Sequence, residues 1–505
     1  MTAPRSARLA RLAAAVPGAR LTGGDPLVTG IQFDSRLVRP GDLFVAVPGT
    51  TTDGARFIPQ AIAAGAVAVV VQALPEPPAV PAIVVPNARE ALAQIAAAFY
   101  GHPARQLRVS GVTGTDGKTT TSHLLWAIYE AAGERSGLVT TIRIVAGDDR
   151  VNATALTTPD AVTIQALLAE MVDAGCRRAV IEASSHALDQ RRLDGVRFSS
   201  ALCTVLDAEH LNYHGTLEAY IAAKARLFAL LEEGGIAVRN AENPLSDRLT
   251  VPAHARQLRF GLAQGDVRAE AIATSAAGTT FQLVSPFGRI PIRTRLIGQF
   301  NVQNWLAAAA VALAEGIPLE AVARAAEAMP PIKGRLEVVD AGQPFRVVVD
   351  FAHTPLALGA VLATLRPLTP GRLIAVFGHA GERDPANRPR MGEIAAAFAD
   401  VIIVTMDDPY SEDPAQIADA IEAGIAQSGR QPAVMRCLDR REAMRRAFAQ
   451  AAPHDTVLVA GRGHETVLEW NGRRIPFDDV VVARELLRDL GYHAPHSADG
   501  LRRTE

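Results

Sequence analysis

A glycine-rich stretch, Gly111-Val-Thr-Gly114-Thr-Asp-Gly117-Lys118-Thr119, most constrains how this chain can fold. An apolar strand pattern at residues 107–109 precedes it, and an apolar helical pattern at residues 123–132 follows it. Between a strand and a helix, glycines permit a tight turn whose N–H groups, with a lysine and the helix N-terminus, bind phosphate. Because Gly111 stands one residue too early for the strict phosphate-loop spacing, the segment from Gly114 to Thr119 is a variant loop that predicts a nucleotide site.

Length and composition indicate a large globular protein. The chain has 505 residues, which suggests about three domains at roughly 150 residues each. Hydrophobic residues make up 49% and charged residues 21%, so an extensive core is expected and disorder is not. The net charge of −2 gives no indication of nucleic acid or an anionic membrane as a partner. No apolar run reaches the roughly 18 residues of a membrane span.

The cysteines and the N-terminus bear on location. Cys176, Cys203 and Cys437 lie far apart, without paired metal spacing, so neither a disulfide framework nor a cysteine metal site is expected. This usage predicts the reducing cytoplasm. Arg11 interrupts the apolar segment near the N-terminus, so we expect an amphipathic first helix rather than a signal peptide.

Residues 1–104 are predicted to form a first α/β domain. Turn residues bound a strand within residues 40–49, and a helix at 57–64 and a strand at 66–71 follow. Ser35 and the threonine loop that contains Thr51 could hydrogen-bond a small polar ligand, although ordinary turn chemistry would also explain them.

Residues 105–331 are predicted to form a central domain with a mostly parallel sheet and helices on both faces. Strand and helix patterns alternate at 107–113, 119–132, 160–175, 178–182, 201–206 and 216–232. Nucleotides bind beyond the carboxyl ends of such strands. Glu182 and His210 both follow strands, so they could meet Thr119 near the phosphates and hold magnesium. His210 and His214, four residues apart, leave zinc as an alternative, but no third ligand has zinc spacing.

Residues 332–505 are predicted to form a second, Rossmann-like doubly wound domain. Its strands are expected at 346–350, 373–377, 400–405 and 456–459, and its helices at 356–366, 391–399, 415–427 and 480–490. Mixed charges in its post-strand loops suit an amino acid, which carries a carboxylate and amines, although solvated loop charges are the alternative. These residues are Arg383, Asp384, Arg388, Asp407, Asp408 and Glu465.

Together these stretches resemble the Mur ligases nearly end to end, and among them the members that extend UDP-N-acetylmuramoyl-L-Ala-D-Glu by a diamino acid. The resemblance implies a UDP-binding N-terminal domain, a central ATP-binding domain and an amino-acid-binding C-terminal domain. It implies an ATP-dependent amide ligase that acts through an acyl phosphate in cytoplasmic peptidoglycan precursor synthesis. The implied partners are small molecules only, with no nucleic acid and no membrane, and the implied state is a monomer.

The resemblance also implies roles for individual residues. Those on the ATP side are Gly114, Thr115, Asp116, Gly117, Lys118, Thr119, Thr120, Asn301, Asn304, Arg335 and Asp350. Those that hold the UDP-linked substrate are Ser35, Thr51, Thr157, Thr158, Ser184, Gln190 and Arg192. Those that select the amino acid are Arg388, Asp407, Asp408, Pro409, Tyr410, Gly461 and Glu465. The implied metal ligands are Thr119, Glu182, His210 and Lys224, the last as a carbamate, and the implied catalytic residues are Lys118, Glu182, His210 and Lys224. Without the resemblance, Lys224 between Tyr220 and Phe228 reads as a surface lysine whose stem packs on apolar neighbours.

Two departures from the family pattern affect the interpretation. Glu209-His210-Leu211-Asn212 stands where Asp-His-Leu-Asp is usual, and the loop with Asn243 lacks the usual acidic pair. A non-catalytic sensor of nucleotide and UDP-sugar is therefore one alternative. A D-Ala-D-Ala ligase is disfavoured by Arg388 with Pro389, and a folate polyglutamate ligase by the N-terminal unit.

The segment Asp407-Asp408-Pro409-Tyr410 predicts the amino acid. Members that select meso-diaminopimelate resemble Asp-Asn-Pro-Arg here, and that arginine can pair with the distal carboxylate in bidentate fashion. Tyr410 cannot form this pair, and Asp408 adds negative charge. The sequence therefore predicts L-lysine or L-ornithine, with diaminopimelate as the alternative if another arginine, such as Arg390, supplies the charge.

Overall fold

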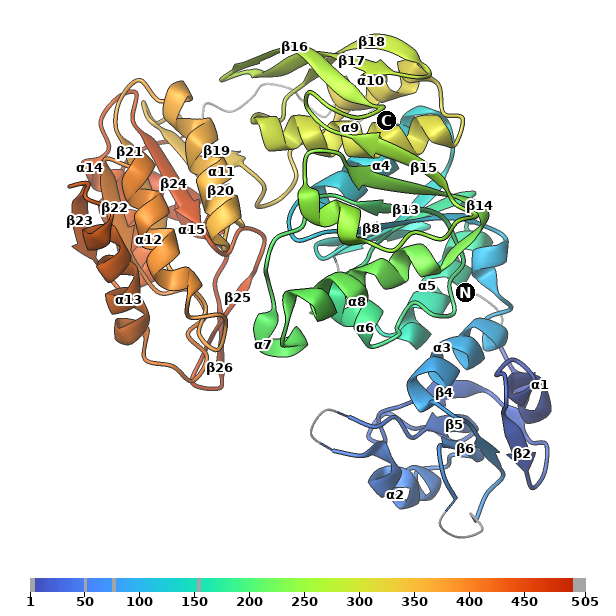
Figure 1. Ribbon diagram of the computed structural model, residues 1–505. Coiled ribbons are helices and arrows are strands. Elements are labelled where there is room, and N and C mark those ends of the chain that lie inside the picture. The colour runs from blue at the N-terminus through green and yellow to red at the C-terminus, as the bar shows by residue number, and fades with distance from the viewer. Residues whose placement is uncertain (1–4, 50–51, 75–78, 152–155, 494–505) are drawn as a thin grey trace, which may run out of the picture.

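The computed structural model describes residues 5–49, 52–74, 79–151 and 156–493. Within them lie three main sheets, each with its own helices and core (Figure 1). The N-terminal body lies at one end of the central body, and the C-terminal body lies beside the central body (Figure 1). Residues of the central and C-terminal bodies together line a cleft between them. The predicted α/β class with three domains is confirmed.

The N-terminal body is built on a five-stranded sheet in the order β2-β7-β6-β5-β4. The strands are β2 (Arg20–Thr22), β7 (Ala82–Val84), β6 (Ala68–Val71), β5 (Asp42–Val45) and β4 (Gly30–Gln32). Only β2 pairs antiparallel. The helices α1 (Leu9–Ala13), α2 (Ile58–Ala63) and α3 (Ala88–Phe99) complete it, with Leu9 and Leu12 buried as an amphipathic first helix requires.

The central body has an eight-stranded sheet in the order β11-β10-β9-β12-β8-β13-β14-β15. The parallel strands are β9 (Ser136–Val139), β12 (Arg178–Glu182), β8 (Arg108–Thr113), β13 (Phe198–Cys203), β14 (Leu231–Asn240) and β15 (Arg256–Phe260). Antiparallel β10 (Arg143–Ala146) and β11 (Asp148–Val151) extend one edge. The central strands are buried on both faces, which explains their continuous apolar runs.

Helices cover both faces of this sheet, as predicted. One core contains α4 (Lys118–Ala131), α9 (Gln299–Ala314) and α10 (Leu319–Ala328). The opposite core contains α5 (Ala161–Asp173), α6 (Ser185–Asp189) and α8 (Leu217–Ala229), which follows the short α7 (Leu211–His214). The sequence did not predict the antiparallel sheet of β16 (Arg268–Ser275), β17 (Gly278–Ser285) and β18 (Gly288–Thr294), which packs on α10.

The C-terminal body has a six-stranded sheet in the order β19-β20-β24-β21-β22-β23. The strands are β19 (Glu337–Val339), β20 (Arg346–Asp350), β24 (Thr456–Ala460), β21 (Leu373–Phe377), β22 (Val401–Val404) and β23 (Ala433–Arg436). On one face lie α11 (Pro355–Leu365), α12 (Asn387–Phe398) and α13 (Pro414–Gln427), and on the other α14 (Arg440–Gln450) and α15 (Asp479–Asp489). A hairpin, β25 (Val467–Trp470) with β26 (Arg473–Pro476), lies on the side of the C-terminal body that faces the central body (Figure 1).

One predicted strand is displaced for a functional reason. The sequence predicted residues 201–206, but β13 ends at Cys203. Beyond it, Thr204 Oγ1 donates to the Asp116 carbonyl at 2.6 Å, and Thr115 N–H donates to the Val205 carbonyl at 2.6 Å. These residues support the glycine-rich loop instead of continuing the sheet.

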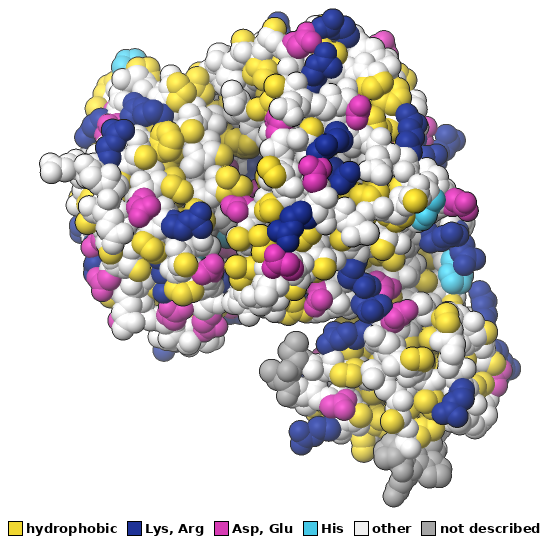
Figure 2. All heavy atoms as spheres, viewed as in Figure 1, with side chains coloured by type: hydrophobic (Ala, Val, Ile, Leu, Met, Phe, Trp, Pro, Cys, Tyr) yellow, Lys and Arg dark blue, Asp and Glu magenta, His cyan; other side chains and the backbone are white. Residues whose placement is uncertain are grey.

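The surface agrees with the low net charge. Basic and acidic side chains are interspersed over the face that Figure 2 shows. Cys176, Cys203 and Cys437 are free thiols, as expected. Among the helices in the described ranges, none combines the length and the apolar character needed to span a membrane.

Candidate active site

The glycine-rich loop joins β8 to α4 and presents its backbone to a cavity. Gly114 has φ 142° and Gly117 has φ 82°. A Cβ on Gly114 would lie 1.9 Å from Thr204 Oγ1, and one on Gly117 would lie 2.5 Å from Asn304 Oδ1. Side chains are therefore excluded at both positions. Lys118 Nζ donates to the Thr115 carbonyl at 2.6 Å, so its ammonium lies over the loop where a phosphate would bind.

Oxygen donors gather beside this loop. Thr119 Oγ1 donates to Glu182 Oε1 at 2.9 Å. The other oxygen of the buried Glu182 carboxylate accepts from Thr141 N–H at 2.9 Å and from Thr141 Oγ1 at 3.1 Å. A carboxylate and a hydroxyl at the phosphate end of the cavity are the hard ligands that suit Mg²⁺. Burial lowers the pKa of His210 to about 3, so its imidazole is neutral, as a metal ligand must be.

The zinc alternative finds no support in the described residues. His210 precedes α7 in a left-handed conformation with φ 56°, so it does not share a helical face with His214. The rings of both histidines pack around His186, with centroids 4.7 and 5.5 Å from its ring. The one group of metal-ligating side chains that converges in the described ranges is Asp407, Asp408 and Glu465.

Lys224 is not a surface residue. Its side chain is 1% exposed, and Nζ donates to the Gly114 carbonyl at 2.6 Å while it lies 4.5 Å from the centre of the Tyr220 ring. Burial and the nearby Lys118 ammonium lower the pKa of Lys224 to about 7. The interpretation from its apolar neighbours alone was therefore wrong, and an amine that is readily deprotonated lies beneath the loop.

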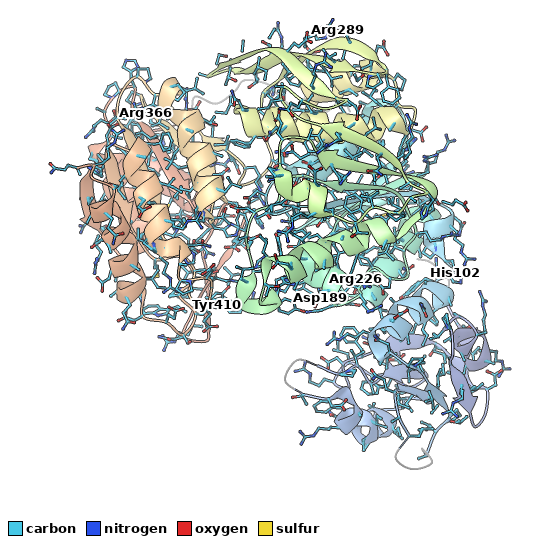
Figure 3. All side chains as sticks on the ribbon, viewed as in Figure 1. His102, Asp189, Arg226, Arg289, Arg366 and Tyr410 are labelled. Atoms are coloured by element: carbon cyan, nitrogen blue, oxygen red, sulfur yellow. The ribbon has the colours of Figure 1, made fainter. Side chains whose placement is uncertain are left out.

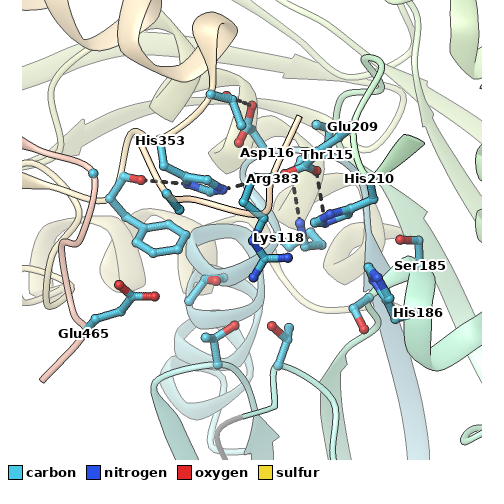
Figure 4. A pocket seen from close by; sticks show the side chains of 18 of the residues that line it. Thr115, Asp116, Lys118, Ser185, His186, Glu209, His210, His353, Arg383 and Glu465 are labelled. Carbon is cyan, nitrogen blue, oxygen red and sulfur yellow. Dashed lines mark hydrogen bonds and ion pairs between the residues drawn. The ribbon is translucent and has the colours of Figure 1, made fainter. Parts of the chain in front are cut away.

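A cavity of about 440 Å³ extends from this loop to the C-terminal body (Figure 4). Polar contacts join the two bodies around it. Arg335 Nη2 donates to Thr119 Oγ1 at 3.3 Å, and Thr354 Oγ1 donates to Asp116 Oδ2 at 3.4 Å. The cleft is thus narrow enough for both bodies to contact one substrate.

Glu209, one of the departures from the family pattern, also bridges the cleft. Its carboxylate lies 3.7 Å from His210 Nε2 and 3.7 Å from His353 Nε2 (Figure 4). Burial acts to raise the pKa of Glu209, but the hydrogen bond from His353 and the charge of His210 outweigh it and lower the pKa. Asn243 has a different role, because its amide exchanges hydrogen bonds with the Leu206 backbone at 3.1 and 3.0 Å.

The amino-acid end of the cavity is acidic around one buried cation. Oxygens of Asp407, Asp408 and Glu465 lie within 4.8 Å of one another. Arg462, fully buried, forms ion pairs with Asp408, with Asp407 at 3.4 Å and with Glu465 at 3.7 Å. Removal from water and the neighbouring Asp407 raise the pKa of Glu465 to about 8. Asp407 and Asp408 against one guanidinium already leave this end short of positive charge, and Glu465 adds a third negative charge when it ionises.

Backbone hydrogen bonds to the β25–β26 hairpin fix the position of Tyr410. It adopts φ 50°, its N–H donates to the Glu469 carbonyl at 3.2 Å, and its carbonyl accepts from Asn471 N–H at 2.7 Å. Arg383 lies over its ring, 5.9 Å from the centroid, and lines the cavity. Arg390, the arginine considered from the sequence, is exposed and does not line it.

Several predicted site residues lie outside the cavity wall. Asn304 accepts from Thr121 Oγ1 at 3.1 Å and donates to Asn301 at 3.2 Å, so this pair supports the loop from behind. Asp350 accepts backbone N–H groups of Leu336 and Ala352 at 2.6 and 2.8 Å. The others outside the wall are Gly114, Ser35, Thr158, Gln190, Arg388 and Pro409. Thr51 lies outside the described residues.

Two of the residues outside the cavity wall have contacts that bear on the site. Arg388 is buried and pairs with Glu412 at 2.8 Å, and its Nε has no hydrogen-bond partner among the described residues. Ser35 Oγ donates to Gln60 Oε1 at 3.0 Å in the N-terminal body. The remaining predicted residues line the cavity: Thr115, Asp116, Gly117, Lys118, Thr119, Thr120, Thr157, Glu182, Ser184, Arg192, His210, Lys224, Arg335, Asp407, Asp408, Tyr410, Gly461 and Glu465.

Sequence reasoning missed three residues at or beside the site: a histidine, an arginine and a threonine. His353 lines the cavity and pairs with Glu209, and its place three residues after Asp350 was the available signal. Arg462 stands between the two predicted residues Gly461 and Glu465, so its position could have drawn attention to it. Thr141, the partner of Glu182, lies in a turn with no motif, and no signal could have found it.

Comparisons with known proteins agree with this geometry. Residues 27–100 match the Mur ligase family, catalytic domain, residues 112–312 the Mur ligase middle domain, and residues 334–463 the Mur ligase, glutamate ligase domain. The chain is 47% identical over 493 residues to the UDP-N-acetylmuramyl-tripeptide synthetase of Roseiflexus sp. (strain RS-1), covering 93% of this chain and 96% of that protein. It is 42% identical over 477 residues to the UDP-N-acetylmuramoyl-L-alanyl-D-glutamate–2,6-diaminopimelate ligase of Geobacillus kaustophilus, covering 93% and 96%.

Comparison with solved structures also finds Mur ligases. A structure of a UDP-N-acetylmuramoyl-L-alanyl-D-glutamate–2,6-diaminopimelate ligase matches with a TM-score of 0.64 and 34% identity, over 92% of this chain and 96% of that chain. MurF from Acinetobacter baumannii shares the fold, with a TM-score of 0.67 at 22% identity over 91% and 96% of the two chains.

The chain therefore belongs to the Mur ligase family. Its relatives over nearly the full length are named as tripeptide synthetases and diaminopimelate ligases, and the chain is an enzyme of this ligase class.

Proposed function

We propose that this enzyme uses ATP to join a diamino acid to the D-glutamyl carboxylate of UDP-N-acetylmuramoyl-L-Ala-D-Glu, with L-lysine or L-ornithine as the diamino acid. The observation that carries the proposal is the single cavity whose wall contains Lys118 and Glu182 at one end and Tyr410 and Glu465 at the other. The relative named as a UDP-N-acetylmuramoyl-L-alanyl-D-glutamate–2,6-diaminopimelate ligase supports the UDP-linked substrate, and the relative named as a tripeptide synthetase supports the product. We assign substrate binding to residues 1–104, ATP binding to 105–331 and amino-acid binding to 332–505.

The first half of the reaction forms an acyl phosphate. A glutamyl carboxylate oxygen attacks the γ-phosphorus of ATP, and ADP leaves with the electron pair of the broken P–O bond. The protein's contribution to such a transfer is positioning and charge stabilisation. Lys118 and the N–H groups between Gly114 and Thr119 would bind the phosphates, and Arg335 would approach them from the C-terminal body.

Magnesium fits the donors beside the loop. Thr119, Glu182 and neutral His210 would hold it, and it would neutralise phosphate charge. We also propose that Lys224 is carbamylated. Its neutral amine attacks CO₂ and loses one proton, which gives an anionic oxygen ligand in place of a cation. Complete burial with a backbone carbonyl as its hydrogen-bond acceptor supports this modification.

The second half of the reaction forms the amide. The amine attacks the acyl carbon, phosphate leaves with its electron pair, and the nitrogen loses a proton. Arg388, whose buried Nε has no hydrogen-bond partner among the described residues, would bind the α-carboxylate of the incoming amino acid. Asp407 and Glu465 would bind its side-chain ammonium. Arg192, Thr157 and Ser184 line the opposite wall and would orient the peptide of the UDP-linked substrate.

The choice between diamino acids rests on the groups around Tyr410. Asp408 contributes less to selectivity than its charge suggests, because Arg462 and the Glu469 N–H group already bind it. The absence of an arginine at position 410 therefore carries the argument for lysine or ornithine. Diaminopimelate is the second candidate, because Arg383 could reach a distal carboxylate from its position over the Tyr410 ring.

Phosphate release with ATP, Mg²⁺ and UDP-N-acetylmuramoyl-L-Ala-D-Glu tests the proposal, with L-lysine, L-ornithine and meso-diaminopimelate supplied separately. We expect turnover with lysine or ornithine. Turnover with diaminopimelate alone would retain the ligase and contradict the selectivity, and no turnover with any of the three would contradict the reaction. We further propose that the enzyme acts as a cytoplasmic monomer, which sedimentation velocity can test for the oligomeric state.

A further inference from the structure

The segment that carries Gln190 and Arg192 is anchored to the N-terminal body through the residue between them. Arg191 adopts φ 58°, in the left-handed region that residues with a side chain seldom occupy. Its Nη1 donates to Glu90 Oε2 at 2.8 Å and to Asp194 Oδ2 at 3.1 Å. Glu90 lies in the first turn of α3, which packs in the core of the N-terminal body. The side chain of Arg191 thus links two bodies.

A second close approach lies one helical turn further along α3. A Cβ on Gly195 would lie 2.4 Å from the Ala93 carbonyl oxygen and 3.0 Å from Gln165 Nε2. Residues 90 and 93 occupy the same face of α3. The segment from Arg191 to Gly195 therefore lies directly against this helix at two points, one an ion pair and one a backbone contact that requires glycine.

The same segment is also bound to the central body, through hydrogen bonds from Arg226. Arg226 Nη2 donates to both oxygens of Asp194 at 2.9 and 2.9 Å, and its Nε donates to the Leu188 carbonyl at 2.8 Å. Arg226 belongs to α8, the helix that carries Lys224, and lies at the edge of the central body nearest the N-terminal body (Figure 3). Asp194 is thus shared between the arginine that reaches α3 and the arginine of α8.

The residues on either side of Arg191 contact the site differently: Arg192 lines the cavity, and Gln190 is hydrogen-bonded to Arg192. Arg192 Nη1 donates to the Thr158 carbonyl at 2.7 Å, and Nη2 donates to Gln190 Oε1 at 2.7 Å. Gln190 Nε2 in turn donates to the Tyr213 hydroxyl at 3.2 Å. Because Arg191 stands between these two hydrogen-bonded residues in the chain, a shift of its backbone would move both side chains.

We infer that Arg191 is a positioning residue for the UDP-linked substrate. Through its ion pair with Glu90, it couples the position of the segment that carries Gln190 and Arg192 to the position of the N-terminal body. The inference rests on the proposed function, in which Arg192 orients the peptide part of a substrate whose UDP part binds the N-terminal body. A substrate that spans both bodies gains affinity when their relative placement is already correct, because less ordering remains to be done on binding.

The test compares the wild type with R191N, E90Q and the double variant. Asparagine tolerates the left-handed backbone, so R191N removes both ion pairs while retaining the turn. E90Q removes only the ion pair between Arg191 and α3. We expect each single variant to raise KM for UDP-N-acetylmuramoyl-L-Ala-D-Glu about tenfold, with kcat and the KM values for ATP and the diamino acid within about twofold. The double variant should be no worse than R191N, because both changes break one contact.

The chain provides a matched control for general loosening of the two bodies. Arg5 pairs with Asp173 of α5 at 2.9 Å, and both side chains are partly exposed, like those of Glu90 and Arg191. R5Q should leave KM for the UDP-linked dipeptide unchanged, while R191K, which retains the charge, should recover part of the loss. R191N and E90Q behaving like R5Q would overturn the inference.

Binding without turnover separates the segment from the UDP site. By calorimetry without ATP, R191N should bind UDP as the wild type does but bind the UDP-linked dipeptide about tenfold more weakly. Equal losses for both ligands would overturn the inference, because the defect would then lie in the N-terminal body. G195A, which leaves Arg191 intact but meets the Ala93 carbonyl, should reproduce the selective loss. Wild-type enzyme without turnover would instead contradict the proposed function.

Discussion

Lys224 and Arg462 are both fully buried basic residues at one cleft, yet their surroundings are opposite. Lys224 lines the cleft, and Arg462 lies behind the acids that line it. Lys224 donates to a single carbonyl and has no carboxylate partner among the described residues, whereas Arg462 is paired with Asp407, Asp408 and Glu465. A buried charge is costly unless it is compensated. The nucleotide end therefore has an amine that benefits from losing its charge, and the amino-acid end has acids that benefit from gaining a cation.

The difference indicates how each end receives its ligand. At the nucleotide end, modification of Lys224 would supply negative oxygens for a metal that accompanies an anionic nucleotide. At the amino-acid end, Arg462 compensates only part of the acidic charge, and the ammonium of the substrate supplies the remainder. Before substrates bind, the nucleotide end thus lacks negative charge and the amino-acid end lacks positive charge.

The largest expected effect is at Lys224. K224M removes the amine that can be carbamylated, and we expect turnover to fall about a thousandfold, as when one preorganised charge-stabilising group is lost. Phosphate release measures the loss. K224R, which retains a cation but cannot be carbamylated, should be equally impaired, and a short carboxylate such as propionate should restore part of the activity of K224M. Activity of K224R near that of the wild type would show that the positive charge itself is needed.

Next comes Arg462, where the expected effect is on stability. R462M leaves Asp407 and Asp408 buried without their cation, and breaking such a pair costs about 3–5 kcal/mol of unfolding free energy. Urea unfolding followed by Trp470 fluorescence in a background without Trp126 and Trp305 reports on the C-terminal body.

The control for this variant is an exposed arginine in the same body. Arg441 pairs with Glu485 at 2.6 Å, with both side chains more than 40% exposed. R441M should cost less than about 1 kcal/mol, since exposed pairs contribute little. Equal effects of R441M and R462M would mean that the acidic cluster does not depend on its buried cation.

The pH dependence of amino-acid binding should follow Glu465. Its pKa is raised to about 8, so below pH 8 the carboxyl is mostly protonated and neutral and cannot pair with an ammonium. As pH rises from 7 to 9 the carboxylate forms while a lysine ammonium, with an ordinary pKa near 10.4, remains charged. We expect KM for the diamino acid to fall up to about tenfold over this range. In E465Q the dependence should disappear; its persistence would assign it to another group.

The two ends also differ in how far the sequence predicted them. The nucleotide end lies in one continuous motif, and strands β12, β20 and β21 were predicted with their observed bounds, because buried parallel strands give unbroken apolar runs. The loop and Glu182 then followed from their positions after predicted strands, whereas the role of Lys224 followed only from the family resemblance. The antiparallel sheet β16–β18 was not predicted, because half of its side chains face solvent and its pattern is weak.

The amino-acid end could be predicted only in part, because its charges compensate one another across the sequence. Asp408 was interpreted as added negative charge, but Arg462, 54 residues away, cancels it. Arg388 was predicted to contact the amino acid, but its ion pair with Glu412, in the loop after the next strand, could not be read from the sequence. Such pairings depend on how loops after different strands meet, which no local pattern records. His353 and Glu209 illustrate the same limit across two bodies.

The smallest expected effect concerns Tyr410. Y410R introduces a guanidinium that can meet a distal carboxylate, and diaminopimelate turnover should rise about fivefold, the value of a partly exposed ion pair. Phosphate release with diaminopimelate measures the gain, and lysine turnover serves as the internal reference. The gain is limited because Arg383, over the same ring, would repel the new cation. R383Q separates the two arginines: if Arg383 already serves a distal carboxylate, R383Q should lower diaminopimelate turnover in the wild-type background. If Y410R gives no gain and R383Q no loss, the selecting contact lies outside this pair, and the acidic cluster around Arg462 becomes the determinant of the side chain that the enzyme accepts.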